Sequence, residues 1–348
     1  MTMSIRSRAP LRISFGGGGT ELSPYLDLYG GLTLSTTISS YATCTISVRE
    51  GGGQHFISQD MNHDFTIGLP DLDSFDLSVA PTECKIAIAC SKFVSNMVDE
   101  PSRKNFVMTT ASDAPQGSGL GASSVLTVAC LKAFDFLYGL HWTKSELAKN
   151  AFLVEREILG LSGGRQDHYA AAYGGLNYVE YSSLGPVSVE PINLSMSSAR
   201  ELEASLLMVY TGTSRESANI IQNQQDEMRN ENSSVISSLH TMKGLAIEMR
   251  KSLLKGNFIE LGELLGHSWE LKKQTSPTIS NQSIDELYDL SLKLGAYGGK
   301  LSGAGGGGFL LLIVPPERKY LIAQEVIGAG KLIFPAKISS EGAVCWTA

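Results

Sequence analysis

The 348-residue sequence has no surplus of basic residues, because 28 Lys and Arg stand against 35 Asp and Glu and give a formal net charge of −7. General nucleic-acid binding requires a basic surface, so this composition argues against it. The sequence also has no apolar run of membrane-spanning length. The longest run, residues 309–314, has the length of a strand and is followed by two prolines. The first residues contain no apolar region typical of a secretory signal. We therefore expect a cytoplasmic protein without a membrane partner.

Cysteine and histidine are scarce, with five and six residues respectively. The cysteines are scattered, odd in number and without the spacing of a metal site, which predicts reduced thiols that pack as small buried hydrophobes. The histidines form no cluster in the sequence. A site built from cysteine or histidine metal ligands is therefore not expected.

The overall composition, with 43% hydrophobic and 18% charged residues, is that of an ordinary globular protein. The length allows two domains, and a loop-like composition at residues 182–186 predicts domains of 1–185 and 186–348. Strand-like and helical patterns are mixed, which predicts an α+β fold. The first half predicts strands at 11–15, 33–48, 55–58, 65–68, 106–110 and 175–180, and helices at 82–98, 125–137 and 143–159. The second half predicts strands at 204–210, 309–314 and 331–338, a helical region over 217–294 and a helix at 317–329.

The most informative segment is the glycine-rich run 112–124, which leads directly into the apolar helix predicted at 125–137. Its glycines, Gly117, Gly119 and Gly121, allow the backbone to approach a ligand closely. The unpaired N–H groups of the helix start and the helix dipole favour an anion there. Ser123 and Ser124 add hydroxyl groups. The segment predicts a nucleotide-phosphate site that lacks the lysine of a Walker P-loop.

Two other interpretations of this loop stay open. Gly117, Gly119 and Ala122 fit the G-x-G-x-x-A form of a dinucleotide-binding loop, with Asp135 near the distance of the acidic partner. That partner should end a strand, however, whereas Asp135 continues a helical pattern. The second alternative is a glycine turn with a serine cap and no ligand.

Residues 155–168 form a second dense segment. Glu155 is a candidate magnesium ligand, because magnesium prefers a few hard oxygen ligands together with nucleotide phosphates. Asp167 is a candidate to orient or deprotonate an acceptor hydroxyl. A solvated helix face followed by a turn aspartate is the alternative. Residues 160–164 also match the G-x-S-x-G elbow of a serine hydrolase with Ser162 as nucleophile, although a helix rather than a strand is predicted before it.

Glycines cluster in four loops, at 16–19, 117–121, 163–164 and 303–308. Glycine runs cost conformational entropy on folding, so four of them favour close approach to a polyphosphate and its acceptor over mere turns. Residues 211–215 also carry polar side chains and Arg215 at a strand end. These residues are candidates for a phosphate contact or for an ordinary turn.

Together these segments resemble the GHMP small-molecule kinases. Three ordered motifs carry the resemblance over essentially the whole chain: residues 9–21, residues 115–124, which are similar to P-x-G-x-G-L-G-S-S-A, and residues 300–309. The resemblance implies a ribosomal-protein-S5-like N-terminal domain and a ferredoxin-like C-terminal domain with ATP between them. It implies ATP contacts at Pro115, Gly117, Ser118, Gly119, Leu120, Gly121, Ala122, Ser123 and Ser124.

The resemblance also implies roles for single residues. Magnesium would be held by Ser123 and Glu155, with Ser124 and Glu157 as alternatives, and Asp167 would be the catalytic residue. Substrate contacts are expected at Arg12, Gly17, Gly18, Thr20, Glu21, Arg165, Gly303 and Gly305.

Two segments resemble those of one branch of the family, the kinases that act on D-glycero-D-manno-heptose 7-phosphate. They are Gly-Gly-Gly-Thr-Glu and Gly-Gly-Arg-Gln-Asp-His. This implies ATP-dependent phosphorylation of the anomeric hydroxyl to the 1,7-bisphosphate, for activated heptose and surface polysaccharide. A fucokinase is the alternative within the family, and its acceptor lacks the distal phosphate. Arg12, Arg165, Arg215 and Lys300 are the basic residues available for that phosphate. We expect ATP, Mg²⁺ and a phosphosugar as ligands, with a homodimer as one possible assembly.

Overall fold

The computed structural model describes residues 4–115, 117–183, 185–212, 217–230 and 232–348. Its larger sheet has the strand order β12-β1-β2-β5-β3-β4, and β6 and β7 extend it from β2. All pairings in this sheet are antiparallel except that of β3 with β5. The strands are β1 (Ser4–Gly16), β2 (Gly31–Arg49), β3 (Gln54–Ser58), β4 (His63–Ile67), β5 (Asn105–Ser112), β6 (Leu176–Tyr181), β7 (Ser188–Pro191) and β12 (Val344–Thr347).

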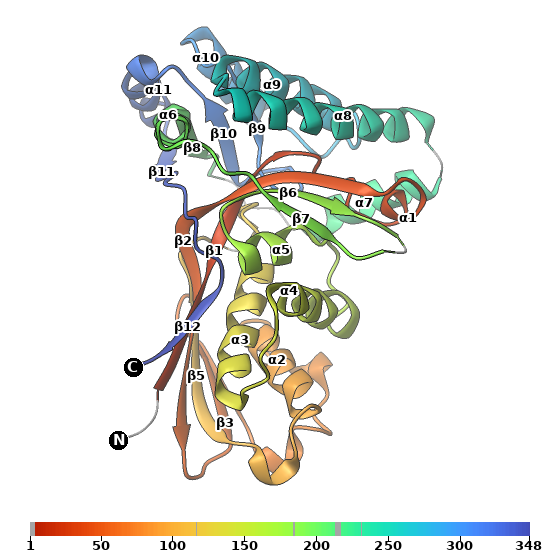
Figure 1. Cartoon of the computed structure of the whole chain (residues 1–348), viewed down its shortest axis with the longest axis vertical. Helices are drawn as coiled ribbons and strands as arrows, with labels where there is room; N and C mark the ends of the chain where they lie inside the picture. The colour runs from red at the N-terminus through yellow and green to blue at the C-terminus, as the bar shows by residue number, and fades with distance from the viewer. Residues whose placement is uncertain (1–3, 116, 184, 213–216, 231) are drawn as a thin grey trace.

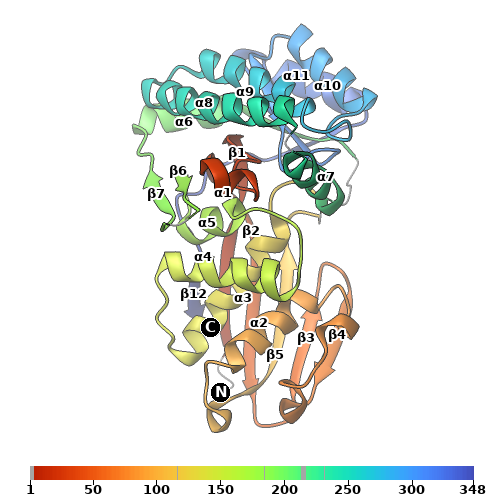
Figure 2. The ribbon, with the colours of Figure 1, turned by 90° about the vertical axis from the view of Figure 1, so that its right-hand side faces the viewer.

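One face of this sheet is covered by a layer of helices, which Figures 1 and 2 show beside β1, β2 and β5. They are α2 (Lys85–Ser95), α3 (Ala122–Tyr138), α4 (Lys144–Phe152) and α5 (Gln166–Tyr173). The central helix α3 is apolar almost all round, with residues such as Val128 and Leu131 fully buried, because it packs between the sheet and the other helices.

The smaller sheet is antiparallel, with the order β11-β8-β10-β9. Its strands are β8 (Leu206–Tyr210), β9 (Gly298–Leu301), β10 (Phe309–Ile313) and β11 (Leu332–Phe334). The helices of this half are α6 (Met196–Ser205), α7 (Ser217–Arg229), α8 (Ser233–Lys255), α9 (Phe258–Lys273), α10 (Gln282–Lys293) and α11 (Pro316–Gly328). The short helix α1 (Tyr25–Tyr29) follows β1.

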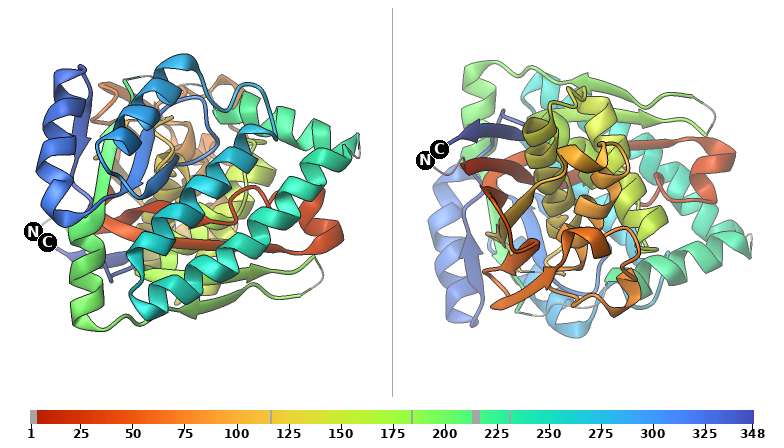
Figure 3. Two further views of the ribbon diagram at one scale, coloured as in Figure 1. Left: turned by 90° about the horizontal axis from the view of Figure 1, so that it is seen from above. Right: turned by 90° about the horizontal axis from the view of Figure 1, so that it is seen from below.

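Helices α8 and α9 cross above the ends of β1 and β2, as the view from above shows (Figure 3). The approach of α8 is close, since a Cβ atom at Gly16 would lie 2.8 Å from Ala246 Cβ. Three asparagines, Asn232, Asn257 and Asn281, divide this helical region by accepting hydrogen bonds from the first turns of α8, α9 and α10.

The predicted α+β class is confirmed. Most predicted elements are present within a few residues of their expected bounds, but the predicted strand 204–210 begins with the end of α6. The predicted helix 143–159 is α4 followed by a π-helical turn, η4 (Leu153–Ile158). The domain division at residue 185 stays a prediction; β7 and β12 lie beyond it in sequence and join the large sheet.

The five cysteines are unpaired thiols, four of them buried, as expected. Within the described ranges, no helix combines the length and the apolar character that crossing a membrane requires.

Candidate active site

A cavity of about 570 Å³ lies where the end of β1, the start of α3, the start of α5 and the residues after β9 meet. Each of the four glycine loops contributes to its wall, with Gly18, Gly119, Gly163 and Gly303 among the lining residues. Segments far apart in the sequence therefore meet at this cavity and bring polar and charged side chains to its wall.

The loop before α3 has the geometry of an anion cradle. Gly119 and Gly121 both have φ of +78°, in the left-handed region that favours glycine. A Cβ at Gly119 would lie 2.3 Å from Ser302 O, and one at Gly121 would lie 2.8 Å from Asp167 Cγ, so neither position has room for a side chain. The buried Ser118 Oγ has no hydrogen-bond partner among the described residues and lies in the cavity wall. The loop thus fits a polar ligand such as a phosphate at the start of α3.

Behind the cradle, Ser123 Oγ donates to Glu155 Oε1 at 2.5 Å. His168 Nε2 lies 2.7 Å from Glu155 Oε2, and an Arg156 nitrogen lies 3.4 Å from the same oxygen. Burial alone would raise the pKa of Glu155, but the charge of Arg156 and the hydrogen bond with His168 outweigh it and lower the pKa to about 2. Glu155 is therefore a buried, ionised carboxylate beside a hydroxyl.

These contacts separate the predicted metal ligands from their alternatives. Ser124 Oγ accepts a hydrogen bond from Arg156 at 3.1 Å, whereas Ser123 is the serine that contacts Glu155. Glu157 is exposed and does not line the cavity. No group of three or more His, Cys, Asp or Glu side chains suited to a metal occurs in the described part of the chain. A magnesium ion here would depend on one carboxylate, one hydroxyl and the nucleotide phosphates, a donor set that magnesium accepts.

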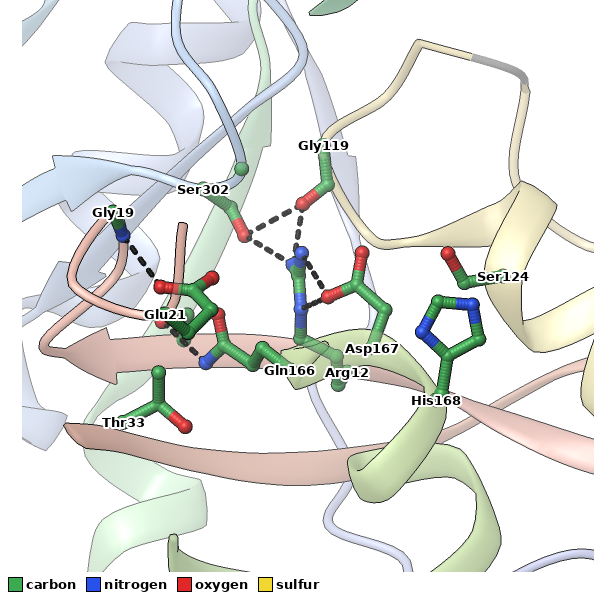
Figure 4. A network of polar contacts seen from close by, with 12 residues as sticks. Arg12, Gly19, Glu21, Thr33, Gly119, Ser124, Gln166, Asp167, His168 and Ser302 are labelled. Carbon is green, nitrogen blue, oxygen red and sulfur yellow. Dashed lines mark hydrogen bonds and ion pairs between the residues drawn. The ribbon is translucent and has the colours of Figure 1, made fainter. Parts of the chain in front are cut away.

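Arg12 connects three of the segments (Figure 4). Its Nε and Nη2 both lie 2.6 Å from Asp167 Oδ1, and its Nη1 donates to Gly119 O at 2.6 Å and to Ser302 Oγ at 3.3 Å. Ser302 Oγ in turn donates to Gly119 O at 3.0 Å. The guanidinium therefore orients the Asp167 carboxylate at the edge of the cradle, and most of its donors are used within the protein.

The part of the wall formed by the end of β1 carries a second buried carboxylate, Glu21. Glu21 Oε2 accepts a hydrogen bond from Gly19 N at 2.7 Å, and burial raises the pKa of Glu21. Beside it in Figure 4, Gln166 donates to Ser14 Oγ at 2.9 Å. All four residues line the cavity and offer polar groups for a hydroxylated ligand.

Most predicted site residues lie in the cavity wall, but some do not. Gly17 packs against Leu32 O, and the buried Thr20 hydroxyl contacts the carbonyls of Gly17 and Leu32. Arg165 lies over the Phe152 ring, and the distance from its Cζ to the ring centroid is 4.9 Å.

Three further predicted ATP and substrate contacts also lie outside the cavity wall. Gly305 packs against Ile279, Leu120 is fully buried, and Pro115 is exposed. These positions support the loops rather than line the cavity. Arg215 lies outside the described residues.

Several wall residues were not predicted from the sequence. They include Lys85 and Ile86 on α2, Gln224 on α7, Lys272 on α9, and Gln166. Lys272 follows a helical pattern and precedes another lysine, so nothing in the local sequence distinguishes it from a surface residue. Only the packing of α9 against the smaller sheet reveals it.

The structure rejects the dinucleotide interpretation. Asp135 lies inside α3, where it pairs with Lys132 and accepts a hydrogen bond from Trp142 N, and it does not end a strand. The hydrolase interpretation also fails, because Ser162 follows the π-helical turn η4 instead of the strand that a nucleophile elbow requires.

Comparison with known proteins agrees with this geometry. The family model described as GHMP kinases N terminal domain matches residues 85–175, and that described as GHMP kinases C terminal matches residues 249–331. A D-glycero-alpha-D-manno-heptose 7-phosphate kinase from Campylobacter jejuni is 35% identical over 345 residues, which cover 99% of both chains. The chain belongs to the GHMP kinase family. It is accordingly a sugar kinase homologue, a phosphotransferase with an alcohol group as acceptor, and GHMP kinases use ATP.

Solved structures of GHMP kinases have the same architecture. The crystal structure of a D-glycero-D-manno-heptose 1-phosphate kinase from Bacteroides thetaiotaomicron has a TM-score of 0.79 and 32% identity, with 98% of each chain covered. The galactokinase of Lactococcus lactis has a TM-score of 0.78 at 17% identity, with 98% of this chain and 95% of that chain covered, and so shares the fold. The GHMP kinase fold predicted from the motifs is confirmed.

Proposed function

We propose that this GHMP kinase transfers the γ-phosphoryl group of ATP to the anomeric hydroxyl of D-glycero-D-manno-heptose 7-phosphate and forms the 1,7-bisphosphate. The product would supply activated heptose for surface polysaccharide, and the enzyme would act in the cytoplasm, where ATP is available. The observation that carries the proposal is that a single cavity joins the cradle before α3, the Ser123–Glu155 pair and the Arg12–Asp167 pair.

In this proposal the cradle binds the phosphates of ATP, with Ser118 Oγ and the N–H groups at the start of α3 as donors. The sugar hydroxyl attacks the γ-phosphorus, its proton passes to Asp167, and ADP leaves. Arg12 holds the carboxylate in place, so the protein contributes mainly by positioning the two substrates and the base. Gly121 allows this arrangement, because the Asp167 side chain occupies the space that a Cβ there would need.

Ser123 and Glu155 are the residues that would hold Mg²⁺. When bound, the ion would neutralise charge on the nucleotide phosphates. His168 fixes one Glu155 oxygen and leaves the other directed at Ser123, which keeps the two prospective ligands together.

The choice of sugar rests on similarity over the full chain to the heptose 7-phosphate kinase of Campylobacter jejuni. A fucokinase is the second candidate, since an L-fucokinase/L-fucose-1-P guanylyltransferase from Bacteroides fragilis is 28% identical over 317 residues, or 86% of this chain and 33% of that protein. Its sugar has no phosphate, so the two candidates differ in the charge of the acceptor.

A coupled assay of ADP release would test the proposal. We expect heptose 7-phosphate to be used with a kcat/KM at least about tenfold above that of the unphosphorylated heptose, L-fucose and D-galactose, because a charge-assisted contact contributes about that much. Detection of the phosphate at carbon 1 by nuclear magnetic resonance identifies the acceptor atom. Preference for L-fucose would favour the second candidate and refute the first.

A further inference from the structure

Two lysine ammonium groups are buried in the cavity wall away from the Ser123–Glu155 pair. Lys272 lies in the last turn of α9 and is 4% exposed, and Lys300 lies on β9 and is 2% exposed. Both line the cavity. Lysine is rarely buried without a partner, so the surroundings of these two groups need an explanation.

The protein satisfies only part of their bonding capacity. Lys272 Nζ donates to Gly303 O, and Lys300 Nζ lies 3.5 Å from Phe15 O. Each ammonium group has three donors. Among the described residues, neither lysine has a carboxylate oxygen within 4.0 Å. Burial lowers the pKa of Lys272 to about 8, and burial together with the charge of Lys272 lowers the pKa of Lys300 well below its ordinary value.

The nearby acidic groups compensate these charges only in part. Asp167 is paired with Arg12, and Glu155 with Arg156 and His168. Glu21 is the remaining carboxylate of the described wall. Its charge raises the pKa of both lysines, but its hydrogen bond comes from the Gly19 N–H group rather than from either lysine. Two buried lysines thus share one carboxylate, and the cost of burying their charge without enough partners is what lowers their pKa values. A ligand with its own negative charge would compensate it.

We propose that Lys272 and Lys300 form the subsite that binds the phosphate group carried by the acceptor sugar. This inference rests on the proposed function and adds the residues that select a phosphorylated acceptor. The subsite is next to Glu21 and the end of β1, because the charge of Glu21 acts on both lysines and Lys300 Nζ lies 3.5 Å from Phe15 O, whereas α2, which carries Lys85, packs against α3 and η4. Lys272 also contacts Gly303, which lies against Gly119 of the cradle, so the triphosphate of ATP is the competing ligand that the test has to exclude. The position beside Glu21 and the end of β1 favours the acceptor phosphate.

Lys272→Met tests the subsite, because methionine retains the length of the buried side chain and removes the charge. Lys273→Met is the matched control; Lys273 is the next residue of α9 and pairs with Glu270 at 2.8 Å. Lys85→Met serves as the comparison on the nucleotide side. For each variant we would measure the melting temperature, the KM for ATP, and kcat/KM for heptose 7-phosphate and for the unphosphorylated heptose.

In Lys272→Met we expect kcat/KM for heptose 7-phosphate to fall by roughly 10- to 100-fold, the range for a lost hydrogen bond to a charged group. The value for the unphosphorylated heptose and the KM for ATP should change less than about threefold. Lys273→Met should behave as the wild type. Equal losses with both sugars, or a loss confined to ATP, would overturn the subsite and in the second case assign Lys272 to the triphosphate.

Inorganic phosphate separates this inference from the proposed function. Calorimetric titration of the wild type should show phosphate binding that Lys272→Met loses while it retains ATP binding, whichever sugar proves to be the substrate. Failure of the wild type to use heptose 7-phosphate, together with phosphate binding that Lys272→Met loses, would refute the proposed sugar and leave the phosphate subsite for another phosphorylated acceptor; preference for an unphosphorylated sugar would refute both. Absence of phosphate binding, or equal binding by Lys272→Met, would refute the subsite.

Discussion

At the scale of single residues, the site depends on charged side chains that other side chains hold in place. Arg12 contributes to both sides of the transfer, because one guanidinium contacts the Asp167 carboxylate and the carbonyl of Gly119 in the cradle. The motifs identified Asp167 and Glu155 because these residues adjoin glycine and helical patterns. They could not show that His168 contacts Glu155, since that contact depends on the three-dimensional packing of α5 against η4.

Replacement of Asp167 by asparagine retains the shape of the side chain but removes the proposed base and its charge. We expect Asp167→Asn to lower kcat by roughly 10²–10⁴-fold, the contribution of a positioned general base. ATP affinity should change little, because ATP binding involves no proton transfer to this residue. Rapid-quench measurement of kcat and calorimetry with ATP provide the two readouts. Asp64→Asn, at an exposed aspartate of β4, is the control. Turnover within a few-fold of the wild type would exclude Asp167 as the base.

Replacement of Glu155 by glutamine tests the metal ligand while preserving a group that can contact Ser123 and His168. We expect the magnesium concentration for half-maximal activity to rise by at least about tenfold, because a charged oxygen ligand is lost. Excess magnesium should restore part of the rate. Titration of activity with MgCl₂ measures the shift, and Glu157→Gln should leave the curve unchanged because that side chain is exposed. The opposite result would transfer the ligand to Glu157.

At the scale of elements, prediction from the sequence succeeded where the pattern was long. The strand expected at 33–48 is β2 over Gly31–Arg49, and the helix expected at 125–137 is α3 over Ala122–Tyr138. The four-residue strands β7, β9 and β12 have too few positions to show an alternation, and they form by pairing with strands distant in sequence. Helix α5 was missed because a glycine-rich segment precedes it. These failures share a cause, since tertiary contacts stabilise all four elements.

At the scale of the whole molecule, the last strand of the chain lies beside the first. Strand β12 pairs with the outer edge of β1, with Ile5 opposite Thr347 and Arg8 opposite Val344, and Figure 1 shows the two strands side by side. Before it, the backbone of Ser339 exchanges hydrogen bonds with Thr37 and Gly175. The last residues therefore connect the smaller sheet, which they leave at β11, to the large sheet that carries most of the site.

Deletion of residues 343–348 would remove β12 and expose the edge of β1. We expect a loss of about 3–5 kcal/mol, from several backbone hydrogen bonds of about 1 kcal/mol each, and a melting temperature lower by roughly 5–10 °C. Differential scanning calorimetry measures both. Arg8→Ala, which removes the exposed ion pair with Glu341 and the contact with the Tyr41 ring but leaves the strand in place, should lower stability by less than about 2 kcal/mol. An unchanged melting temperature in the deletion variant would show that β12 adds nothing to the stability of the sheet.

The π-helical turn η4 has a consequence for how related sequences are aligned. Leu159 N bonds to Val154 O, five residues back, so this turn holds one residue more than an α-helical turn would. Each residue of an α-helix rotates the chain by about 100°, so removal of one residue before Glu155 would turn its carboxylate away from Ser123. The number of residues in this turn therefore determines the direction in which the Glu155 side chain points. A sequence alignment with relatives that places a gap wrongly within this turn would match the metal ligand to a neighbouring residue such as Glu157.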